Sequence, residues 1–299
     1  MDHKIKIFYT EDWTDYELLD TGEGEKLERF GRHNFVRPYE DAVWPKTLSK
    51  KEWTDIDGKF WSAKTGAKPG WKMERKFAER WEMEYKGIKF HASPTPFRHL
   101  SFFPEQATHW DFIEQKIGSF VKDSPLQKPK FLNLFGYTGV ASLFALRAGA
   151  DVTHLDASSQ SLKLAKENQN LNTGLVESPM RIIEDDVLKF LEREAKRGNT
   201  YDAVIMDPPK FGRGPKGEVW KIEESLPKLL TAVKRVLSNK PLFVILTSYA
   251  IESSSLSLGY ALSETMKDKK GEVQAGEMCV LETSNKRTIP LANTAIWSA

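Results

Sequence analysis

The chain has 299 residues, 40% of them hydrophobic, and a formal net charge of +2 at pH 7. This length and apolar content are enough to bury a core of ordinary size, and they predict two domains. Because the charge is nearly balanced, a polynucleotide partner would have to be held by a local basic patch. The single cysteine, Cys279, excludes both a disulfide within the chain and a zinc site made of cysteines.

The sequence carries no sign of export or of membrane insertion. No apolar run reaches the length that spans a bilayer, and the first residues alternate in charge without an apolar core of signal-peptide length. A single cysteine also fits a reducing compartment. We therefore expect a cytoplasmic protein that has no membrane partner.

Residues 1–90 predict a small, mostly β domain, because short apolar runs alternate there with glycine and proline. Six tryptophans are spread through this segment and could either form its core or stack on exposed bases, as in substrate recognition. They are Trp13, Trp44, Trp53, Trp61, Trp71 and Trp81.

Residues 91–299 predict a second domain. The proline-rich segment His91–Trp110 is typical of a connector, and from Lys130 onward apolar strands alternate with helical patterns. This alternation predicts a parallel sheet with helices on both faces.

The segment Tyr201–Phe211 predicts a buried strand that ends at an active-site edge. Its apolar run stops at Asp207, and Pro208 and Pro209 cannot donate to a sheet, so they must lie beyond the carboxyl end of the strand. Ligands bind at that end in open α/β sheets. The Asp207 carboxylate and the Pro208 carbonyl could accept hydrogen bonds from an amino group, and Phe211 could stack on a planar ring.

An earlier strand, Phe131–Phe135, leads into a glycine turn and then into a helix that stops near Gly149. Gly136 and Gly139 allow the backbone of this turn to approach a ligand closely. The next strand ends at Asp156, 20 residues after Gly136, where an acid can bind ribose hydroxyls. A third strand ends in acids that include Asp186, so carboxylates collect at one sheet edge.

Two ligands of the nucleotide type fit this edge, a dinucleotide and S-adenosylmethionine. A dinucleotide needs a G-x-G-x-x-G loop for its pyrophosphate, and Gly136-Tyr137-Thr138-Gly139 is too short for that. S-adenosylmethionine carries a sulfonium and an amino-acid tail in place of phosphates. A glycine turn flanked by carboxylates therefore favours S-adenosylmethionine.

The spaced combination of these motifs resembles the class I S-adenosylmethionine-dependent methyltransferases, and among them the bacterial 23S ribosomal RNA large-subunit group. The motifs are Phe135–Gly139, His154–Ala157, Glu167–Asn172, Glu184–Asp186 and Asp207–Phe211. The resemblance covers residues 91–299 and implies a Rossmann-like sheet of seven strands whose last strand is antiparallel. Glu277–Leu281 and Thr294–Trp297 would supply its last two strands.

The resemblance also implies roles for particular residues. The glycines would lie along the methionine part of the donor, Asp156 would hold the ribose, and Asp186 would approach the adenine amino group. A segment with Phe103, Glu105 and Gln106 would close over the donor, or would be a plain surface connector. The full donor set is Phe103, Gln106, Phe135, Gly136, Tyr137, Thr138, Gly139, Asp156, Ala157, Asp186 and Asp207.

The sequence argues against methylation of a carbon of cytosine, because that chemistry needs a thiolate that adds to the ring. Where the related cytosine enzymes carry their cysteine, this chain has Thr247 and Ser248, and Cys279 has the setting of a core residue. The Asp207-Pro-Pro motif is similar to that of nitrogen methyltransferases. Those enzymes usually place the aromatic residue directly after the prolines, whereas Lys210 intervenes here.

We therefore expect a direct, metal-free methyl transfer to a base nitrogen of RNA, most specifically ribosomal RNA, with Asp207, Pro208 and Phe211 in catalytic roles. A protein or small-molecule acceptor, or a non-catalytic RNA-binding module, is the alternative. The basic loop Gly212–Gly217 could clamp a phosphate backbone or be a solvated loop, and the helix Glu223–Leu237 has the apolar spacing of core packing. The sequence does not predict the oligomeric state.

Overall fold

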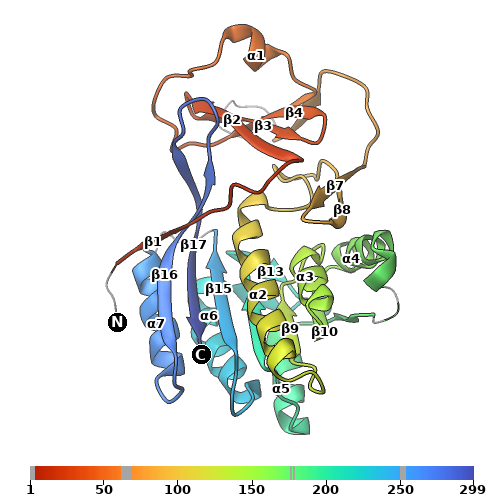
Figure 1. The fold of residues 1–299 in the computed structure, drawn as a ribbon. Helices are drawn as coiled ribbons and strands as arrows, with labels where there is room; N and C mark the ends of the chain where they lie inside the picture. Colours follow the sequence, from red (N-terminus) through yellow and green to blue (C-terminus); the bar gives the residue numbers. More distant parts are fainter. Residues whose placement is uncertain (1–3, 62–68, 176, 178, 250–253) are drawn as a thin grey trace. The chain divides into compact units, whose positions relative to one another are not determined.

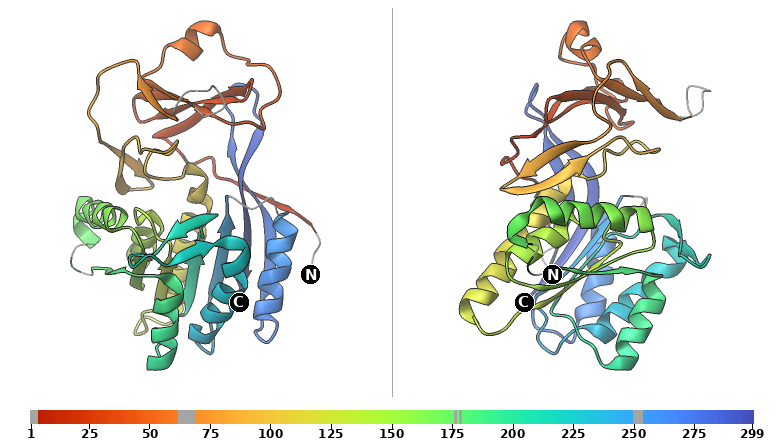
Figure 2. Two further views of the ribbon diagram at one scale, coloured as in Figure 1. Left: turned by 180° about the vertical axis from the view of Figure 1, so that it is seen from behind. Right: turned by 90° about the vertical axis from the view of Figure 1, so that its right-hand side faces the viewer.

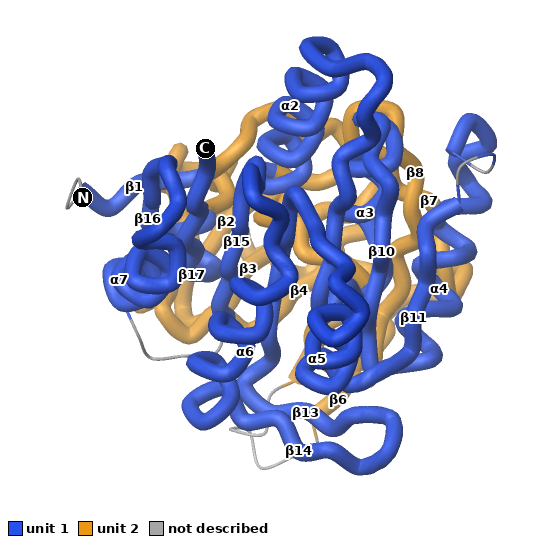
Figure 3. Tube along the Cα trace, turned by 90° about the horizontal axis from the view of Figure 1, so that it is seen from below, with its two compact units in different colours: residues 1–8, 108–278, 291–299 blue, residues 9–107, 279–290 orange. Residues whose placement is uncertain are grey.

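The computed structural model describes residues 4–61, 69–175, 177, 179–249 and 254–299 (Figure 1). The chain forms two compact units, coloured separately in Figure 3. Unit 1 comprises residues 1–8, 108–278 and 291–299, and unit 2 comprises residues 9–107 and 279–290. Both units are discontinuous in sequence. A single domain boundary at residue 90 does not describe such units. The assignment of domains to residues 1–90 and 91–299 therefore stays a prediction.

An eight-stranded sheet lies at the centre of unit 1, in the order β1-β16-β17-β15-β12-β9-β10-β11 (Figure 1). Its central pairs are parallel, and β17 runs antiparallel to β15. The predicted Rossmann-like sheet with an antiparallel last strand is thereby confirmed. The strands are β1 (Lys6–Phe8), β9 (Lys130–Leu134), β10 (Asp151–Asp156), β11 (Arg181–Glu184), β12 (Ala203–Met206), β15 (Phe243–Ser248), β16 (Glu272–Leu281) and β17 (Thr288–Ser298).

The eighth strand is β1, which pairs in parallel with β16 and was not predicted from the sequence. It comprises only Lys6–Phe8, which is too short to show a pattern in the sequence, and Ile7 lies opposite Glu277 of β16.

Helices cover both faces of this sheet, as expected. Figures 1 and 2 show α2 (Ala107–Asp123), α3 (Val140–Arg147) and α4 (Ser159–Leu171) on one face. The other face is covered by α5 (Val187–Arg197), α6 (Ile222–Val236) and α7 (Ser255–Met266). The shorter elements of this unit are η3 (Thr173–Leu175), β13 (Phe211–Arg213) and β14 (Val219–Lys221).

Helix α5 illustrates how the sequence fixes these boundaries. The Asp186 side chain accepts from the backbone N–H of Lys189 and so begins the helix. Gly198 ends it in the left-handed region at φ 70°. Val187, Phe190 and Leu191 are spaced so that they share one buried face against the sheet.

Unit 2 is small and mostly β, as expected. It contains a five-stranded sheet in the order β2-β3-β4-β5-β6 and a separate hairpin of β7 and β8. Its elements are β2 (Tyr16–Gly22), β3 (Glu25–Phe30), β4 (His33–Pro38), α1 (Lys50–Thr54), β5 (Gly58–Trp61), β6 (Gly70–Met73), β7 (Trp81–Tyr85), β8 (Ile88–Ala92) and η2 (Pro104–Gln106).

Tryptophans of unit 2 take part in its packing. Trp13 donates from Nε1 to the carbonyl of Pro104 at 3.1 Å, and its ring lies 4.5 Å from that of Tyr85. Trp53 is buried and donates from Nε1 to Asp20 at 2.9 Å. Trp61 is 38% exposed, so a base-stacking role is left open for this ring.

A buried cluster of charges connects strands β3 and β4 of unit 2. Arg37 donates from Nε and Nη2 to the two carboxylate oxygens of Glu28, each at 2.6 Å, and Lys26 lies 3.2 Å from the same carboxylate. Burial alone would raise the pKa of Glu28, but the charges of Arg37 and Lys26 outweigh it and lower the pKa to about 2. This pairing stabilises the fold above the ordinary glutamate pKa of 4.5, and the contribution is lost as the pH falls through about 2.

Replacement of Arg37 by methionine is expected to destabilise the protein by about 3–5 kcal/mol, because the Glu28 carboxylate then lacks its bidentate partner in the core. Urea denaturation of the full chain measures this change. The triple variant K26M/E28Q/R37M should lose less than R37M alone, since it removes all three charges of the cluster. Arg75→Met, which breaks an exposed pair with Asp55, is the control and should have little effect. A loss for R37M no larger than that of the control would contradict the prediction.

Candidate active site

The carboxyl ends of four neighbouring strands meet at one edge of the unit 1 sheet. Leu134 of β9 pairs with Leu155 of β10 and with Met206 of β12, and Asp156 pairs with Glu184 of β11. The next residue along each strand therefore leaves the sheet at the same level. The structure thus brings together the turn Phe135–Gly139 and the carboxylate residues Asp156, Asp186 and Asp207.

The turn Phe135–Gly139, called here the donor turn, has an unusual backbone. Phe135, Tyr137 and Gly139 have φ values of 58°, 52° and 84°, in the left-handed region that non-glycine residues rarely adopt. A Cβ on Gly136 would lie 2.3 Å from Cε1 of His154, and one on Gly139 would lie 2.9 Å from Cβ of Ala165. Strained backbone of this kind clusters at ligand sites, where surrounding contacts hold it in place.

Buried polar groups supply those contacts. The ring of His154 lies under the turn, with Nε2 3.3 Å from the carbonyl oxygen of Tyr137 and Nδ1 3.0 Å from Oγ of Ser142. Burial lowers the pKa of His154 to about 4, so the ring is neutral at pH 7. Asn168 donates to the carbonyl of Thr138 at 2.9 Å. In the sequence, His154 and Asn168 stand out only as parts of motifs, and their spacing from the glycine turn is the signal that could have identified them.

Asp156 connects the donor turn to its own strand. Its Oδ2 accepts from the backbone N–H of Tyr137 at 2.8 Å, and its Oδ1 accepts from that of Ser158 at 2.9 Å. Burial raises the pKa of Asp156, against these backbone hydrogen bonds. A carboxylate offers about four lone-pair positions, so both oxygens keep acceptor capacity for hydroxyl groups. Ala157 follows, half-buried.

Asp186 has a structural task as well, since its Oδ1 caps helix α5 through the N–H of Lys189 at 3.0 Å. Within the described part of the chain, its Oδ2 takes part in no hydrogen bond. The neighbouring Asp185 pairs with Arg193 instead.

The segment Asp207–Lys210, called here the acceptor loop, is held along its backbone. The N–H of Asp207 lies 3.4 Å from the carbonyl of Leu134, and the N–H of Ile222 donates to the carbonyl of Lys210 at 3.1 Å. Trp220 donates from Nε1 to the carbonyl of Pro209 at 2.7 Å. Pro208 is buried. The backbone of the acceptor loop is therefore held in place at the carboxyl end of β12.

Trp220 is a site residue that was not predicted from the sequence. Its ring lies 4.9 Å from that of Phe135, at an interplanar angle of 63°, so one side chain contacts both the acceptor loop and the donor turn. Trp220 belongs to β14, which pairs with β13 in an antiparallel hairpin. The predicted basic loop Gly212–Gly217 is in fact part of this hairpin and its turn. Phe211 begins β13 and is 56% exposed.

The hydroxyls of Thr247 and Ser248 lie at the carboxyl end of β15, beside β12. Both are buried, and neither has a hydrogen-bond partner among the residues that the structure describes. They stand where the resemblance would place the thiol of a cytosine enzyme, whereas Cys279 is 2% exposed within β16.

The segment predicted to close over the donor belongs to unit 2. Phe103 precedes η2, with its ring 4.7 Å from that of His99, and Glu105 and Gln106 are buried within that unit. Burial raises the pKa of Glu105. A role of Phe103 and Gln106 toward the donor stays a prediction.

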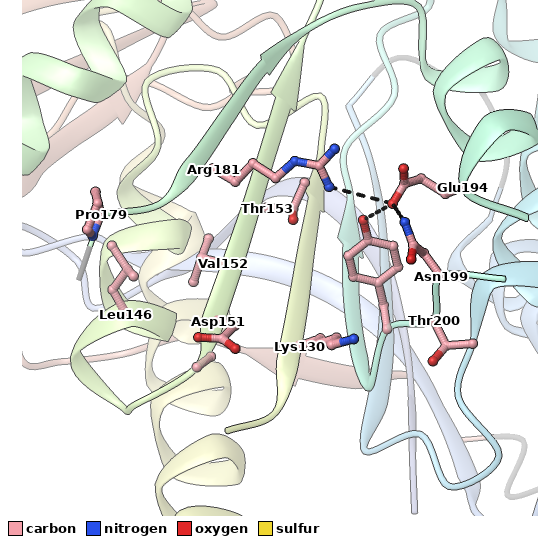
Figure 4. A pocket seen from close by; sticks show the side chains of 12 residues that line it. Lys130, Leu146, Asp151, Val152, Thr153, Pro179, Arg181, Glu194, Asn199 and Thr200 are labelled. Atoms are coloured by element: carbon pink, nitrogen blue, oxygen red, sulfur yellow. Dashed lines mark hydrogen bonds and ion pairs between the residues drawn. The ribbon is translucent and has the colours of Figure 1, made fainter. Parts of the chain in front are cut away.

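A polar pocket of about 460 Å³ lies at the opposite edge of the sheet (Figure 4). The pocket is lined by the first residues of three strands, Lys130 of β9, Asp151 of β10 and Arg181 of β11. It is therefore remote from the donor turn, which follows the other end of β9. Glu194 accepts hydrogen bonds from Tyr201 at 2.8 Å and from Asn199 at 2.9 Å, and Figure 4 shows Asn199 and Glu194 side by side. We place the candidate site at the carboxyl edge, where the strained turn and the acids meet.

Metal-binding clusters and membrane-spanning helices are both absent from the described residues. These residues contain no group of three or more histidine, cysteine or acidic side chains placed to hold a metal ion. None of the helices in the described ranges has the length and apolar character needed to cross a bilayer.

Comparison with known proteins shows which proteins this chain is similar to. A family described as "Conserved hypothetical protein 95" matches residues 107–248. The ribosomal RNA large subunit methyltransferase K/L of Desulfotalea psychrophila is 38% identical over 122 residues, which are 40% of this chain and 16% of that protein. The ribosomal RNA large subunit methyltransferase I of Cronobacter sakazakii is 36% identical over 101 residues, which are 33% of this chain and 25% of that protein. The chain thus matches a quarter or less of the length of either relative.

A solved structure matches nearly the whole chain. The S-adenosylmethionine-dependent methyltransferase of Agrobacterium tumefaciens is 37% identical, with a TM-score of 0.92 over 99% of this chain and 94% of that one. A structure from Streptococcus mutans, at 15% identity and a TM-score of 0.72, shares the fold. Because one relative is this similar along almost its full length, the chain belongs to the S-adenosylmethionine-dependent methyltransferases.

Proposed function

We propose that the protein transfers a methyl group from S-adenosylmethionine to a base nitrogen of RNA, with ribosomal RNA as the first candidate. The observation that carries the proposal is the acceptor loop, whose backbone is held at the sheet edge that also holds the donor turn. The names of the relatives from Desulfotalea and Cronobacter favour ribosomal RNA as the acceptor. A cytoplasmic location and a metal-free reaction belong to the same proposal.

The donor turn fits S-adenosylmethionine. Glycine at positions 136 and 139 lets the turn pack closely on His154 and Ala165, which a Cβ at either position would meet, and the turn so keeps its shape at the sheet edge. Asp156 keeps acceptor capacity for the two ribose hydroxyls, and Oδ2 of Asp186 is available to the adenine amino group. When bound, the donor supplies an electrophilic methyl group on a sulfonium.

The acceptor loop would orient the base. Asp207 and the Pro208 carbonyl would accept hydrogen bonds from an amino group, so that the nitrogen lone pair points at the methyl carbon. The new N–C bond forms as the C–S bond breaks, which releases S-adenosylhomocysteine, and the proton that the nitrogen loses passes to solvent water. Such alignment contributes about 7–11 kcal/mol, against about 1.5–3 for a hydrogen bond to a charged acceptor. In place of the expected stacking on this ring, we assign Phe211 to the RNA beside the target base, because its side chain lies on the hairpin face opposite Trp220 and is 56% exposed.

A protein or a small molecule is the alternative acceptor. Lys210, Arg213 and Lys216 are exposed within and just beyond the acceptor loop, and this local positive charge favours RNA. The two kinds of acceptor are distinguished by measuring tritiated-methyl transfer to total RNA and to protein substrates in the same preparation.

Asp207→Ala is expected to lower the rate of methyl transfer by about 100-fold or more, because misalignment of the reacting atoms costs this much. Donor affinity, measured by calorimetry, should remain close to that of the parent protein. Asp202→Ala, a carboxylate loss at the other end of the same strand, is the matched control. Parent-like transfer by the Asp207 variant would show that the acceptor loop is misassigned.

Gly136→Ala is expected to weaken binding of S-adenosylmethionine by about 5- to 150-fold, because the added methyl group overlaps His154 and overpacking costs about 1–3 kcal/mol. Calorimetric titration, with NAD as a second ligand, measures the affinity. Gly118→Ala in α2 is the matched control, since a Cβ there meets no atom within 4 Å. If both variants bound the donor equally well, the glycine turn would have no part in donor binding.

A further inference from the structure

The hairpin of β13 and β14 presents one exposed face. Phe211 pairs with Lys221 and Arg213 pairs with Val219, so their side chains share a face, while Trp220 points to the other side. Phe211 and Val219 are each 56% exposed, although both are hydrophobic. We call the surface of Phe211, Arg213, Val219 and Lys221 the outer face of the hairpin.

The charges around the outer face leave cations uncompensated. In the part of the chain that the structure describes, the side chains of Lys210, Arg213 and Lys216 take part in no ion pair or hydrogen bond. Of the acids nearby, Glu218 pairs with Lys189, Glu224 lies 2.9 Å from Lys221 and raises its pKa, and Glu223 raises the pKa of Lys221 further. Residues 210–224 therefore carry four basic and three acidic side chains, a net charge of +1.

The inner face attaches this surface to the candidate site. Trp220 is 5% exposed and donates to the carbonyl of Pro209 at 2.7 Å, while its ring packs against Phe135. The carbonyl of Gly214 and the N–H of Gly217 close the turn at 3.0 Å. Anything held on the outer face therefore has a fixed position relative to Asp207.

We infer that the outer face binds the single-stranded RNA that flanks the target base. A base must leave its stack to reach an enzyme's acceptor site, and its neighbours are then unstacked too. An aromatic ring beside cations that lack acidic partners is the combination that binds single strands, by stacking and by phosphate contact. The inference rests on the proposed function. It adds the path by which the RNA leaves the site, which runs from Phe211 toward Arg213 and Lys216.

The salt dependence of RNA binding tests this inference. The probe is a short fluorescein-labelled oligo(U), titrated by anisotropy against the full chain at several salt concentrations, beside an RNA duplex of equal length. Each phosphate of a single strand that a cation neutralises adds about 0.7 to the magnitude of the slope of log K against log salt, so R213Q/K216Q should lower that magnitude by about 1.4. The control K196Q/K240Q removes the same charge near the amino-terminal edge of the sheet and should leave the slope unchanged.

A second variant tests the aromatic contact independently of charge. Phe211→Ala is expected to weaken oligo(U) binding by about 5- to 150-fold with an unchanged salt slope, because it removes stacking alone. Since Phe211 is 56% exposed, the variant should unfold close to the parent's urea midpoint.

Three results would overturn the inference: no binding of oligo(U) by the parent protein, a parent-like slope for R213Q/K216Q, or equal affinity for the duplex. Methyl transfer to total RNA separates this failure from that of the proposed function. If the parent protein transfers methyl groups to RNA and R213Q/K216Q keeps the parent's salt slope, the outer-face inference is wrong and the proposed function stands. Donor binding without any label in RNA sinks the proposed function, whatever the slope.

Discussion

The parallel register of β9 with β10 and β12 is the constraint on which the site depends. Because Leu134 lies level with Leu155 and Met206, the chain leaves all three strands at one height. The N–H of Gly136 then donates to the carbonyl of Leu155 at 2.9 Å, which continues the ladder beyond the end of β9. A slip of one residue in either pairing would turn the side chains of a strand to the other face and separate the donor turn from Asp156.

The two loops at this edge are held by different means. The donor turn keeps left-handed residues in place through buried polar contacts to Asp156 and His154, whereas the acceptor loop is limited by its prolines and by the hydrogen bond from Trp220. Phe135 and Trp220 meet ring to ring between them. A substitution at either ring would therefore alter the packing of both the donor turn and the acceptor loop, although neither ring carries a reacting group.

The fold and the line of acids could be predicted because they depend on local pattern. Apolar runs that stop at Asp156 and Asp207 mark strand ends wherever those strands lie, and a glycine turn before a helix needs no tertiary information. The sequence did not predict the roles of Trp220 and His154 or the strand β1. Each of these depends on a contact with residues distant in the sequence. Nothing near Trp220 in the sequence indicates that its indole meets the carbonyl of Pro209, and three residues of β1 show no period.

The discontinuity of unit 2 has a consequence for its biosynthesis. Oε1 of the buried Glu282 accepts from both the backbone N–H and the hydroxyl of Thr21, each at 2.6 Å, and Ser284 donates to Asp20 at 2.6 Å. On the ribosome, Asp20 and Thr21 emerge long before these partners have been translated. The polar groups of Asp20 and Thr21 therefore stay unmatched until Glu282 and Ser284 have been translated, 261 or more residues later, so this part of unit 2 reaches its native environment late.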